Sequence, residues 1–207
     1  MGVNGRQEGI MRIQIHNPRT PEVEVDSMFI DRWSPRGFID EPLSQPQVQS
    51  LFEAARWAPS CYNEQPWVFV YAVSRQDRQR FATALVEKNQ LWASRAPLLM
   101  FVLARRTFAG TGKPNRHAGF DAGAAWMSLA LQARRLGLYA HAMAGFDQEK
   151  AHELLGVPRE EFEVMAAIAV GPRGDGSHLP GDLAAKEAPN LRKPLAAVAR
   201  EARLSSP

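Results

Sequence analysis

Cysteine is almost missing from this sequence, since Cys61 is the only one in 207 residues. A single cysteine excludes an intrachain disulfide and a zinc site built from cysteines, and it is typical of a reducing compartment. Long apolar runs are missing too: the longest, residues 97–104, is followed at once by Arg105 and Arg106, whereas crossing a bilayer takes ~20 apolar residues. The first residues lack the apolar stretch of an export signal. We therefore expect a soluble protein of the cytoplasm with no membrane partner.

A strong excess of one charge is also absent. The chain has 25 Lys and Arg against 22 Asp and Glu, a formal net charge of +3, and the basic residues are scattered, which argues against a nucleic-acid partner. Where they do gather, each group is small enough to suit one phosphate rather than a polyanion. These groups are Arg32 with Arg36, Arg105 with Arg106, and Arg192 with Lys193. The pattern predicts a nucleotide-like ligand.

Motifs of several common enzyme classes are lacking. No G-x-G-x-x-G follows an expected strand, which argues against a Rossmann domain, and no G-x-S-x-G marks a hydrolase nucleophile. Residues 110–113, Gly-Thr-Gly-Lys, look like part of a Walker loop, but Thr107 stands in the place of the first glycine and Pro114 follows the lysine. The five histidines show no metal-ligand spacing; His117 and Asp121 share a helix face, where a capping or surface pair is the simpler interpretation. We expect no metal site.

The chain divides into a short leader and one domain. Residues 1–25 lack hydrophobic periodicity and carry Pro18 and Pro21, so we interpret them as a flexible N-terminal arm outside the core. Residues 26–207 have the length and apolar content of a single globular domain.

Helical and extended patterns alternate along this domain. Helix signals cover residues 25–32, 44–58, 118–136 and 147–155, and further helices are expected to start at residue 74 and to cover 195–204. Apolar or β-branched runs predict strands at 67–73, 97–104 and 164–170, whereas residues 171–190 are expected to be irregular. On its own, this alternation would suggest a doubly wound α/β sheet.

Two arginines and a serine lie within five residues in the stretch Arg32-Trp-Ser34-Pro-Arg36. Guanidinium forks bind phosphate oxygens in pairs, and a hydroxyl can donate between them. The sequence therefore allows a phosphate site at this helix end. An ordinary solvated pair of arginines is an equally open interpretation.

The most informative stretch is the loop of residues 58–67, Ala-Pro-Ser-Cys-Tyr-Asn-Glu-Gln-Pro-Trp. Two prolines stiffen this loop, which carries Ser60, Asn63 and Gln65. The pyrimidine edge of a flavin alternates carbonyl acceptors with an N–H donor, and a side-chain amide offers both complements. The loop is suited to reading such a ring edge. A polar turn with Trp67 in the core is the alternative.

With these stretches in place, the chain resembles the nitroreductase-like FMN-dependent oxidoreductase superfamily from about residue 29 to residue 194. The four matching stretches occur in the family's order: residues 32–38, similar to Arg-x-Ser-x-Arg-x-Phe; residues 58–67, similar to Ala-Pro-Ser-x-x-Asn-x-Gln-Pro-Trp; residues 121–125 through 136–138 and 145–146; and Asn-Leu-Arg-Lys-Pro at 190–194. Each stretch is weak alone, but four in the right order are specific.

The resemblance implies an α+β fold with a mostly antiparallel sheet flanked by helices, in an intertwined homodimer with a C-terminal extension. It also implies a set of cofactor-binding residues. Arg32, Ser34 and Arg36 would hold the phosphate and ribityl groups of FMN together with Arg192. Ser60 and Asn63 would come from the other subunit, and Gln65 would also bind the cofactor. Gly145 would offer its N–H near flavin N5, and Asn89 would face the flavin. The chain departs from the family at Ala144, where many members carry Glu.

The resemblance further implies tight, non-covalent FMN at the subunit interface and NAD(P)H as a transient co-substrate. The residues at 110–113 themselves form a basic loop that is suited to be a rim for this negatively charged cofactor. Hydride would pass from NAD(P)H through flavin N5 to a small organic acceptor, such as a nitroaromatic or a quinone, in a ping-pong scheme. No catalytic side-chain acid or base is expected, although His141 is close enough to Gly145 in the sequence to touch substrate. Dehalogenation, desaturation or flavin breakdown on the same scaffold, or a non-catalytic flavin sensor or carrier, are the alternatives.

Overall fold

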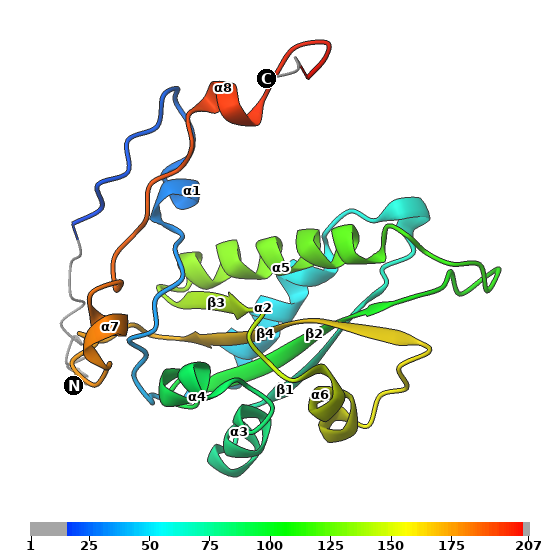
Figure 1. The fold of residues 1–207 in the computed structure, drawn as a ribbon, viewed down its shortest axis with the longest axis horizontal. Coiled ribbons are helices and arrows are strands. Elements are labelled where there is room, and N and C mark those ends of the chain that lie inside the picture. The colour runs from blue at the N-terminus through cyan, green and yellow to red at the C-terminus, as the bar shows by residue number, and fades with distance from the viewer. Residues whose placement is uncertain (1–15, 205–207) are drawn as a thin grey trace, which may run out of the picture.

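A four-stranded antiparallel sheet forms the centre of the protein (Figure 1). The computed structural model describes residues 16–204. The strands are β1 (Trp67–Ala72), β2 (Leu98–Arg105), β3 (Tyr139–Met143) and β4 (Phe162–Gly171), in the order β1-β2-β4-β3. All neighbouring pairs are antiparallel. The predicted α+β class with an antiparallel sheet is confirmed.

The doubly wound sheet that alternation alone would suggest is wrong. Ala72 at the end of β1 pairs with Leu99 near the start of β2. Residues 73–97 therefore leave the sheet and return to it at the same end of the strands. Two short helices fill that connection instead of one crossover helix, and an alternating pattern does not by itself set the direction of the next strand.

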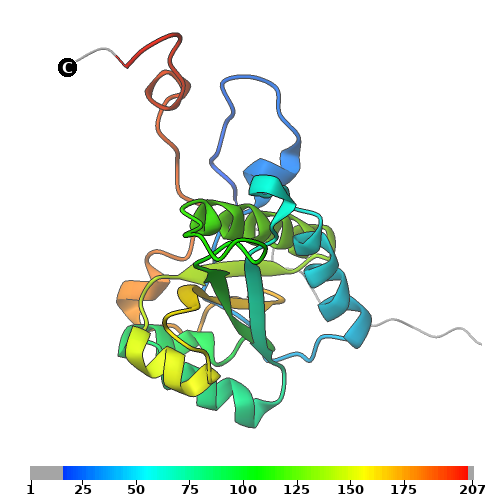
Figure 2. The same cartoon turned by 90° about the vertical axis from the view of Figure 1, so that its right-hand side faces the viewer.

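Helices cover both faces of the sheet. Their bounds are α1 Ser27–Asp31, α2 Gln45–Arg56, α3 Arg75–Ala82, α4 Glu87–Ala93, α5 Ala118–Arg135, α6 Gln148–Leu155, α7 Gly181–Ala184 and α8 Leu195–Val198, with a 3₁₀ turn at Cys61–Asn63. Figure 2 shows α2 and α5 on one face and α3, α4 and α6 on the other. None of the helices within residues 16–204 is both long and apolar enough to span a membrane.

Strand β2 is buried on both faces, which explains its uninterrupted apolar sequence. Leu98, Met100 and Val102 pack toward α2 and α5, whereas the alternate residues face the other core. Strand β4 contains a bulge. Val102 pairs with Ala166, but the next residue of β2, Leu103, pairs with Val164, so the alternation of side chains between the two faces shifts by one residue in β4. The bulge keeps the apolar side chains of β4 on the correct faces.

Local hydrogen bonds start several helices where the sequence predicts them. The Ser44 hydroxyl and the Gln47 side chain form a capping box at α2, and Asp147 caps α6 by accepting the Lys150 N–H at 3.1 Å. Gly156, with φ of 63°, ends α6 in the left-handed conformation. These signals act within four residues, so they do not depend on the rest of the fold.

Other element boundaries differ from prediction. The helix expected from residue 74 is divided into α3 and α4, because the segment between them leaves the helix and Leu85 pairs with Phe146 in an antiparallel bridge. The helix expected over 195–204 ends at Val198 and buries none of its residues, so no packing stabilises a longer one. The stretch expected to be irregular contains α7, and α1 is shorter than its prediction.

The two terminal segments of the described chain lie side by side (Figure 1). The Arg19 side chain donates to the Asn190 carbonyl at 2.7 Å, and the Leu195 N–H donates to the Glu22 carboxylate at 2.8 Å. Residues 1–15 of the predicted arm lie outside the described residues. The described part of that arm is therefore joined to the C-terminal segment.

Candidate functional site

A cavity of about 460 Å³ opens between α1, α5, β3 and the C-terminal segment. Arg32, Ser34 and Arg192 line it, and these are three of the residues predicted to hold a phosphate. Arg32 directly follows α1, and Ser34 is two residues further on. Phe29, Trp126, Met127 and Ala142 complete the wall. The fold thus brings together residues that are about 160 positions apart in the chain.

This cavity is strongly positive. Burial lowers the pKa of Arg32, and the neighbouring charge of Arg192 lowers it further. The Arg32 Nη1 group donates to the Ser34 hydroxyl at 3.4 Å. Among residues 16–204, no ion pair involves Arg32 or Arg192. Uncompensated guanidinium groups with a hydroxyl between them suit a phosphate anion.

Arg36 does not line the same cavity. The Glu187 carboxylate accepts its backbone N–H at 2.9 Å and the Gly37 N–H at 2.8 Å. The Arg36 guanidinium lies 6.0 Å from the ring centroid of buried Trp92. The glutamate therefore determines the backbone position of Arg36, and the sequence offered no signal for it.

His141 on β3 is packed into this region. Its Nδ1–H donates to the Pro35 carbonyl at 2.8 Å, and its ring centroid is 4.6 Å from that of Trp92. Burial lowers the pKa of His141 to about 4; the charges of Arg36 and Arg32 also lower it, while the bond to Pro35 opposes the shift. His141 is therefore neutral near pH 7 and cannot serve there as a general acid.

Asn89 and Gly145, two further predicted cofactor residues, are in direct contact. The Asn89 side-chain amide donates to the Gly145 carbonyl at 3.0 Å, and the Val86 N–H donates to the same oxygen at 3.0 Å. A Cβ atom on residue 145 would lie 2.7 Å from Asn89 Nδ2. Only glycine fits here without displacing the asparagine.

The loop that carries Ser60, Asn63 and Gln65 has a strained backbone. Tyr62, Asn63 and Gln65 have φ angles of 53°, 58° and 52°, a region that side chains with a Cβ rarely adopt. Ser60 Oγ accepts the Gln65 N–H at 3.0 Å, and the buried Asp121 carboxylate accepts the Cys61 N–H at 3.1 Å. Strain of this kind gathers at functional sites.

Asp121 holds the Ser60–Gln65 loop, a role that the sequence pattern did not predict. The pattern predicts a capping or surface pair with His117, but Asp121 is only 3% exposed and holds the loop. The His117 ring accepts instead from the Arg116 side chain at 3.2 Å. That interpretation of Asp121 is wrong because the loop folds over the start of α5. Within residues 16–204, no cluster of three or more potential metal ligands occurs.

The two halves of the predicted site lie apart in one chain. The Ser60–Gln65 loop is at the N-terminal end of α5, whereas α1 and the C-terminal segment are at the other end (Figure 1). Neither the 460 Å³ cavity nor the neighbouring cavity of about 390 Å³ that Arg192 also lines has a residue of that loop in its wall.

Comparison with known proteins identifies the class. Residues 30–172 match the family model described as "Nitroreductase family", so the chain belongs to the nitroreductase family, and the predicted resemblance is confirmed. A crystal structure titled as "the oxidoreductase containing FMN" is 43% identical, with a TM-score of 0.87, over 94% of this chain and 100% of that chain.

Two relatives come from bacteria. A Stenotrophomonas maltophilia protein named "Putative NADH dehydrogenase/NAD(P)H nitroreductase" is 28% identical over 147 residues, 62% of this chain and 75% of its own length. The nitrobenzene nitroreductase of Ectopseudomonas oleovorans is 41% identical over 63 residues, 30% of this chain and 27% of that protein. These names agree with the predicted enzyme class.

Proposed function

We propose that this nitroreductase-family oxidoreductase uses tightly bound FMN to pass hydride from NAD(P)H to a small organic acceptor, such as a nitroaromatic or a quinone, in a ping-pong scheme. The observation that carries the proposal is the convergence of Arg32, Ser34 and Arg192 on one cavity. The names of the relatives support both the cofactor and the donor.

The donor set of the cavity fits the phosphate of FMN. A phosphate monoester presents three oxygens and up to two negative charges, and paired guanidinium groups with a hydroxyl match them. Burial lowers the pKa of Arg32, and repulsion from the nearby Arg192 lowers it further. An anion in the cavity would remove this repulsion.

The ring half of FMN would be held by Gly145, Asn89 and the Ser60–Gln65 loop. The loop offers a hydroxyl and two amide side chains, which can donate to and accept from a pyrimidine edge. Because none of the loop residues lines the phosphate cavity and the loop lies at the N-terminal end of α5 (Figure 1), we assign Ser60, Asn63 and Gln65 to the cofactor of a second subunit. FMN then lies at the interface of a homodimer.

Exposed aromatic residues around the loop support that dimer. Tyr62 is 92% exposed, Phe120 81% and Trp57 73%. Large aromatic side chains this exposed favour an interaction surface. A second copy of the chain that places the loop beside its partner's cavity would bury the aromatic side chains nearest to the loop.

The residues of the site position and polarise the cofactor. FMN supplies the hydride-transfer chemistry when it is bound. Arg36, whose backbone N–H is held by Glu187, would contribute positive charge to the phosphate and ribityl groups. Neutral His141 supports the Pro35 backbone without exchanging protons near pH 7. No catalytic side-chain acid or base is assigned.

The basic loop that follows β2 is placed to meet NAD(P)H. The Glu64 carboxylate accepts the Ala109 N–H at 2.6 Å, so this loop is tied to the Ser60–Gln65 loop. Lys113 is exposed on it. Its charge would attract the phosphates of the dinucleotide at the rim of the site. We place the protein in the cytoplasm, where its lone cysteine stays reduced.

The visible spectrum of the purified protein tests this function. We expect flavin bands that bleach when NADPH or NADH is added without oxygen and that return when a nitroaromatic or quinone is added. A flavin spectrum that does not bleach would favour a sensor, a carrier or an enzyme with another donor. A colourless protein that FMN does not reconstitute would refute the proposal.

A further inference from the structure

Arg19 lies in the predicted arm, outside residues 30–172 that match the family model. Its guanidinium nevertheless makes three hydrogen bonds to main-chain carbonyls. Nε donates to Asn190 at 2.7 Å, and Nη1 donates to Ile30 at 2.9 Å and to Arg32 at 2.7 Å. One side chain thus joins the end of α1 to the C-terminal segment.

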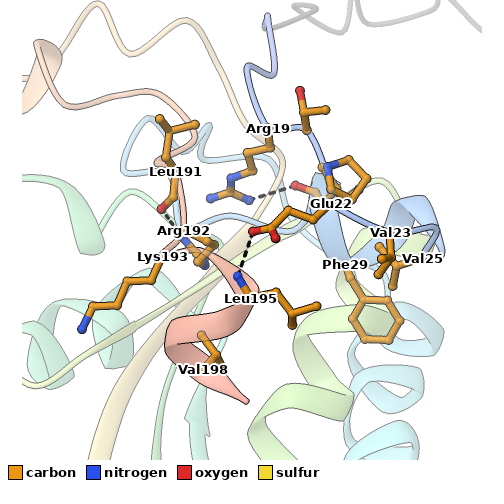
Figure 3. A pocket seen from close by; sticks show the side chains of 13 residues that line it. Arg19, Glu22, Val23, Val25, Phe29, Leu191, Arg192, Lys193, Leu195 and Val198 are labelled. Atoms are coloured by element: carbon orange, nitrogen blue, oxygen red, sulfur yellow. Dashed lines mark hydrogen bonds between the residues drawn. The ribbon is translucent and has the colours of Figure 1, made fainter. Parts of the chain in front are cut away.

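These carbonyls belong to the two segments that build the phosphate cavity. Arg32 is itself a lining residue, and Asn190 is two positions before Arg192. Figure 3 shows Arg19 and Arg192 on facing segments around a second, more apolar cavity of about 390 Å³. Phe29 and Arg192 line both cavities, so the two are neighbours.

Arg19 also adds to the positive charge. Burial lowers its pKa, and Arg192 and Arg32 lower it further. Its Nη2 atom is buried without a hydrogen-bond partner in the described chain, and no ion pair within residues 16–204 involves Arg19. Three cations held together in this way repel one another, and an anion bound among them would offset this repulsion.

We propose that Arg19 is a positioning residue of the phosphate site, which holds Arg32 and Arg192 around the cavity and adds positive charge for a phosphate monoester. This inference rests on the proposed FMN function. It gives the described part of the N-terminal arm a role in cofactor binding.

Binding of FMN and riboflavin to the apoprotein tests the proposal, because the two ligands differ only in the phosphate. We expect Arg19→Met to weaken FMN binding about tenfold or more, because Arg32 and Arg192 lose their fixed positions and the site loses one positive charge. Riboflavin binding should stay within about twofold of wild type. Exposed Arg75, the first residue of α3, supplies the control Arg75→Met, which should change neither affinity. Equal losses for both flavins, or no loss for FMN, would overturn the proposal.

A second variant separates geometry from charge. Arg19→Lys keeps the charge but cannot reach three carbonyls with one ammonium group. We expect it to weaken FMN binding, by less than Arg19→Met, and to leave riboflavin binding unchanged. Wild-type FMN affinity in Arg19→Lys would contradict the positioning role, and this variant carries the test if Arg19→Met fails to fold.

Inorganic phosphate provides a readout that does not need FMN. We expect phosphate to raise the melting temperature of the wild-type apoprotein and of Arg75→Met, but not that of Arg19→Met. If the wild type binds phosphate but not FMN, the proposed function fails while this inference stands. If the wild type binds FMN and Arg19→Met binds it equally well, the inference alone fails.

Discussion

The Asn89 side chain donates a 3.0 Å hydrogen bond to the carbonyl of Gly145, 56 residues further along the chain. This bond ties α4 to the turn between β3 and α6. Because the Val86 N–H donates to the same oxygen, the peptide that follows Gly145 has a defined orientation.

The close contact at Gly145 predicts that Gly145→Ala is destabilising. The added Cβ would lie 2.7 Å from Asn89 Nδ2 and 3.0 Å from Val86 Cγ2, and overpacking of this kind costs about 1–3 kcal/mol of unfolding free energy. Urea denaturation measures the change. Gly110→Ala is the control, since its Cβ would meet nothing within 4 Å; equal stability of both variants would contradict the prediction.

The positive φ angle of Tyr62 predicts that glycine is more stable than alanine at this position. Its side chain is 92% exposed and its φ is 53°, a conformation that costs roughly 1–2 kcal/mol for residues with a Cβ. We expect Tyr62→Gly to be about 1 kcal/mol more stable than Tyr62→Ala, because both lose the ring but only glycine removes the strain. Thermal or urea unfolding compares the pair, and a less stable glycine variant would show that the backbone is not strained there.

The burial of His141 predicts an acid-sensitive stability. Its folded pKa of about 4 is below the ordinary value of 6.5, so below pH 6.5 the unfolded chain binds a proton that the folded chain excludes. His141 therefore does not change the unfolding free energy above pH 6.5, and it lowers the unfolding free energy increasingly as the pH falls toward 4. Between pH 7 and pH 5 we expect the unfolding free energy to fall by about 2 kcal/mol from this group.

The His141→Asn variant isolates that contribution. Asparagine can still donate to the Pro35 carbonyl but does not titrate. We expect the difference in unfolding free energy between pH 7 and pH 5 to be smaller in His141→Asn than in wild type. Identical pH profiles for wild type and His141→Asn would refute the assignment.

The proposed shared site predicts complementation between two defective variants. Arg32→Met damages the phosphate cavity, and Asn63→Ala damages the loop. If each FMN contacts Arg32 of one subunit and Asn63 of the other, a mixed dimer contains one site with both defects and one intact site. Random co-expression makes half of the dimers mixed, so about one quarter of wild-type activity should return.

Reductase assays on the co-expressed mixture measure that recovery, and mixed dimers purified through differently tagged subunits should reach about half of wild-type activity. Each homodimeric variant gives the baseline. If Asn63 instead contacted FMN bound to its own chain, every site in the mixed dimer would carry one defect and no activity would return.

Some features of the fold depend on short stretches of sequence, and these were predictable. Ser44 with Gln47 and Asp147 with Lys150 form caps within three residues, and the apolar run of β2 reflects burial on two faces. The family resemblance, which also comes from short ordered motifs, indicated the antiparallel sheet that periodicity missed.

Other features depend on the path of the whole chain. Asp121 holds the Cys61 N–H across 60 residues, and Arg19 reaches Asn190 across 171. No periodic pattern marks such partners, because they meet only after the elements between them have folded. The left-handed conformations of Tyr62 and Gln65 could not be predicted from the sequence either, since glycine is the residue that usually indicates a positive φ angle.

The sequence by itself determined the chemical groups of this protein: arginines and a serine that suit a phosphate, amide side chains that suit a ring edge, and the local signals that start its helices. The tertiary structure alone decided which of these groups meet. It placed Arg32 and Arg192 in one cavity, joined Arg19 to the segments that carry them, and held the Ser60–Gln65 loop at the N-terminal end of α5. Local signals act through neighbouring backbone groups, whereas a binding site needs contacts between distant segments that only the packed core brings together.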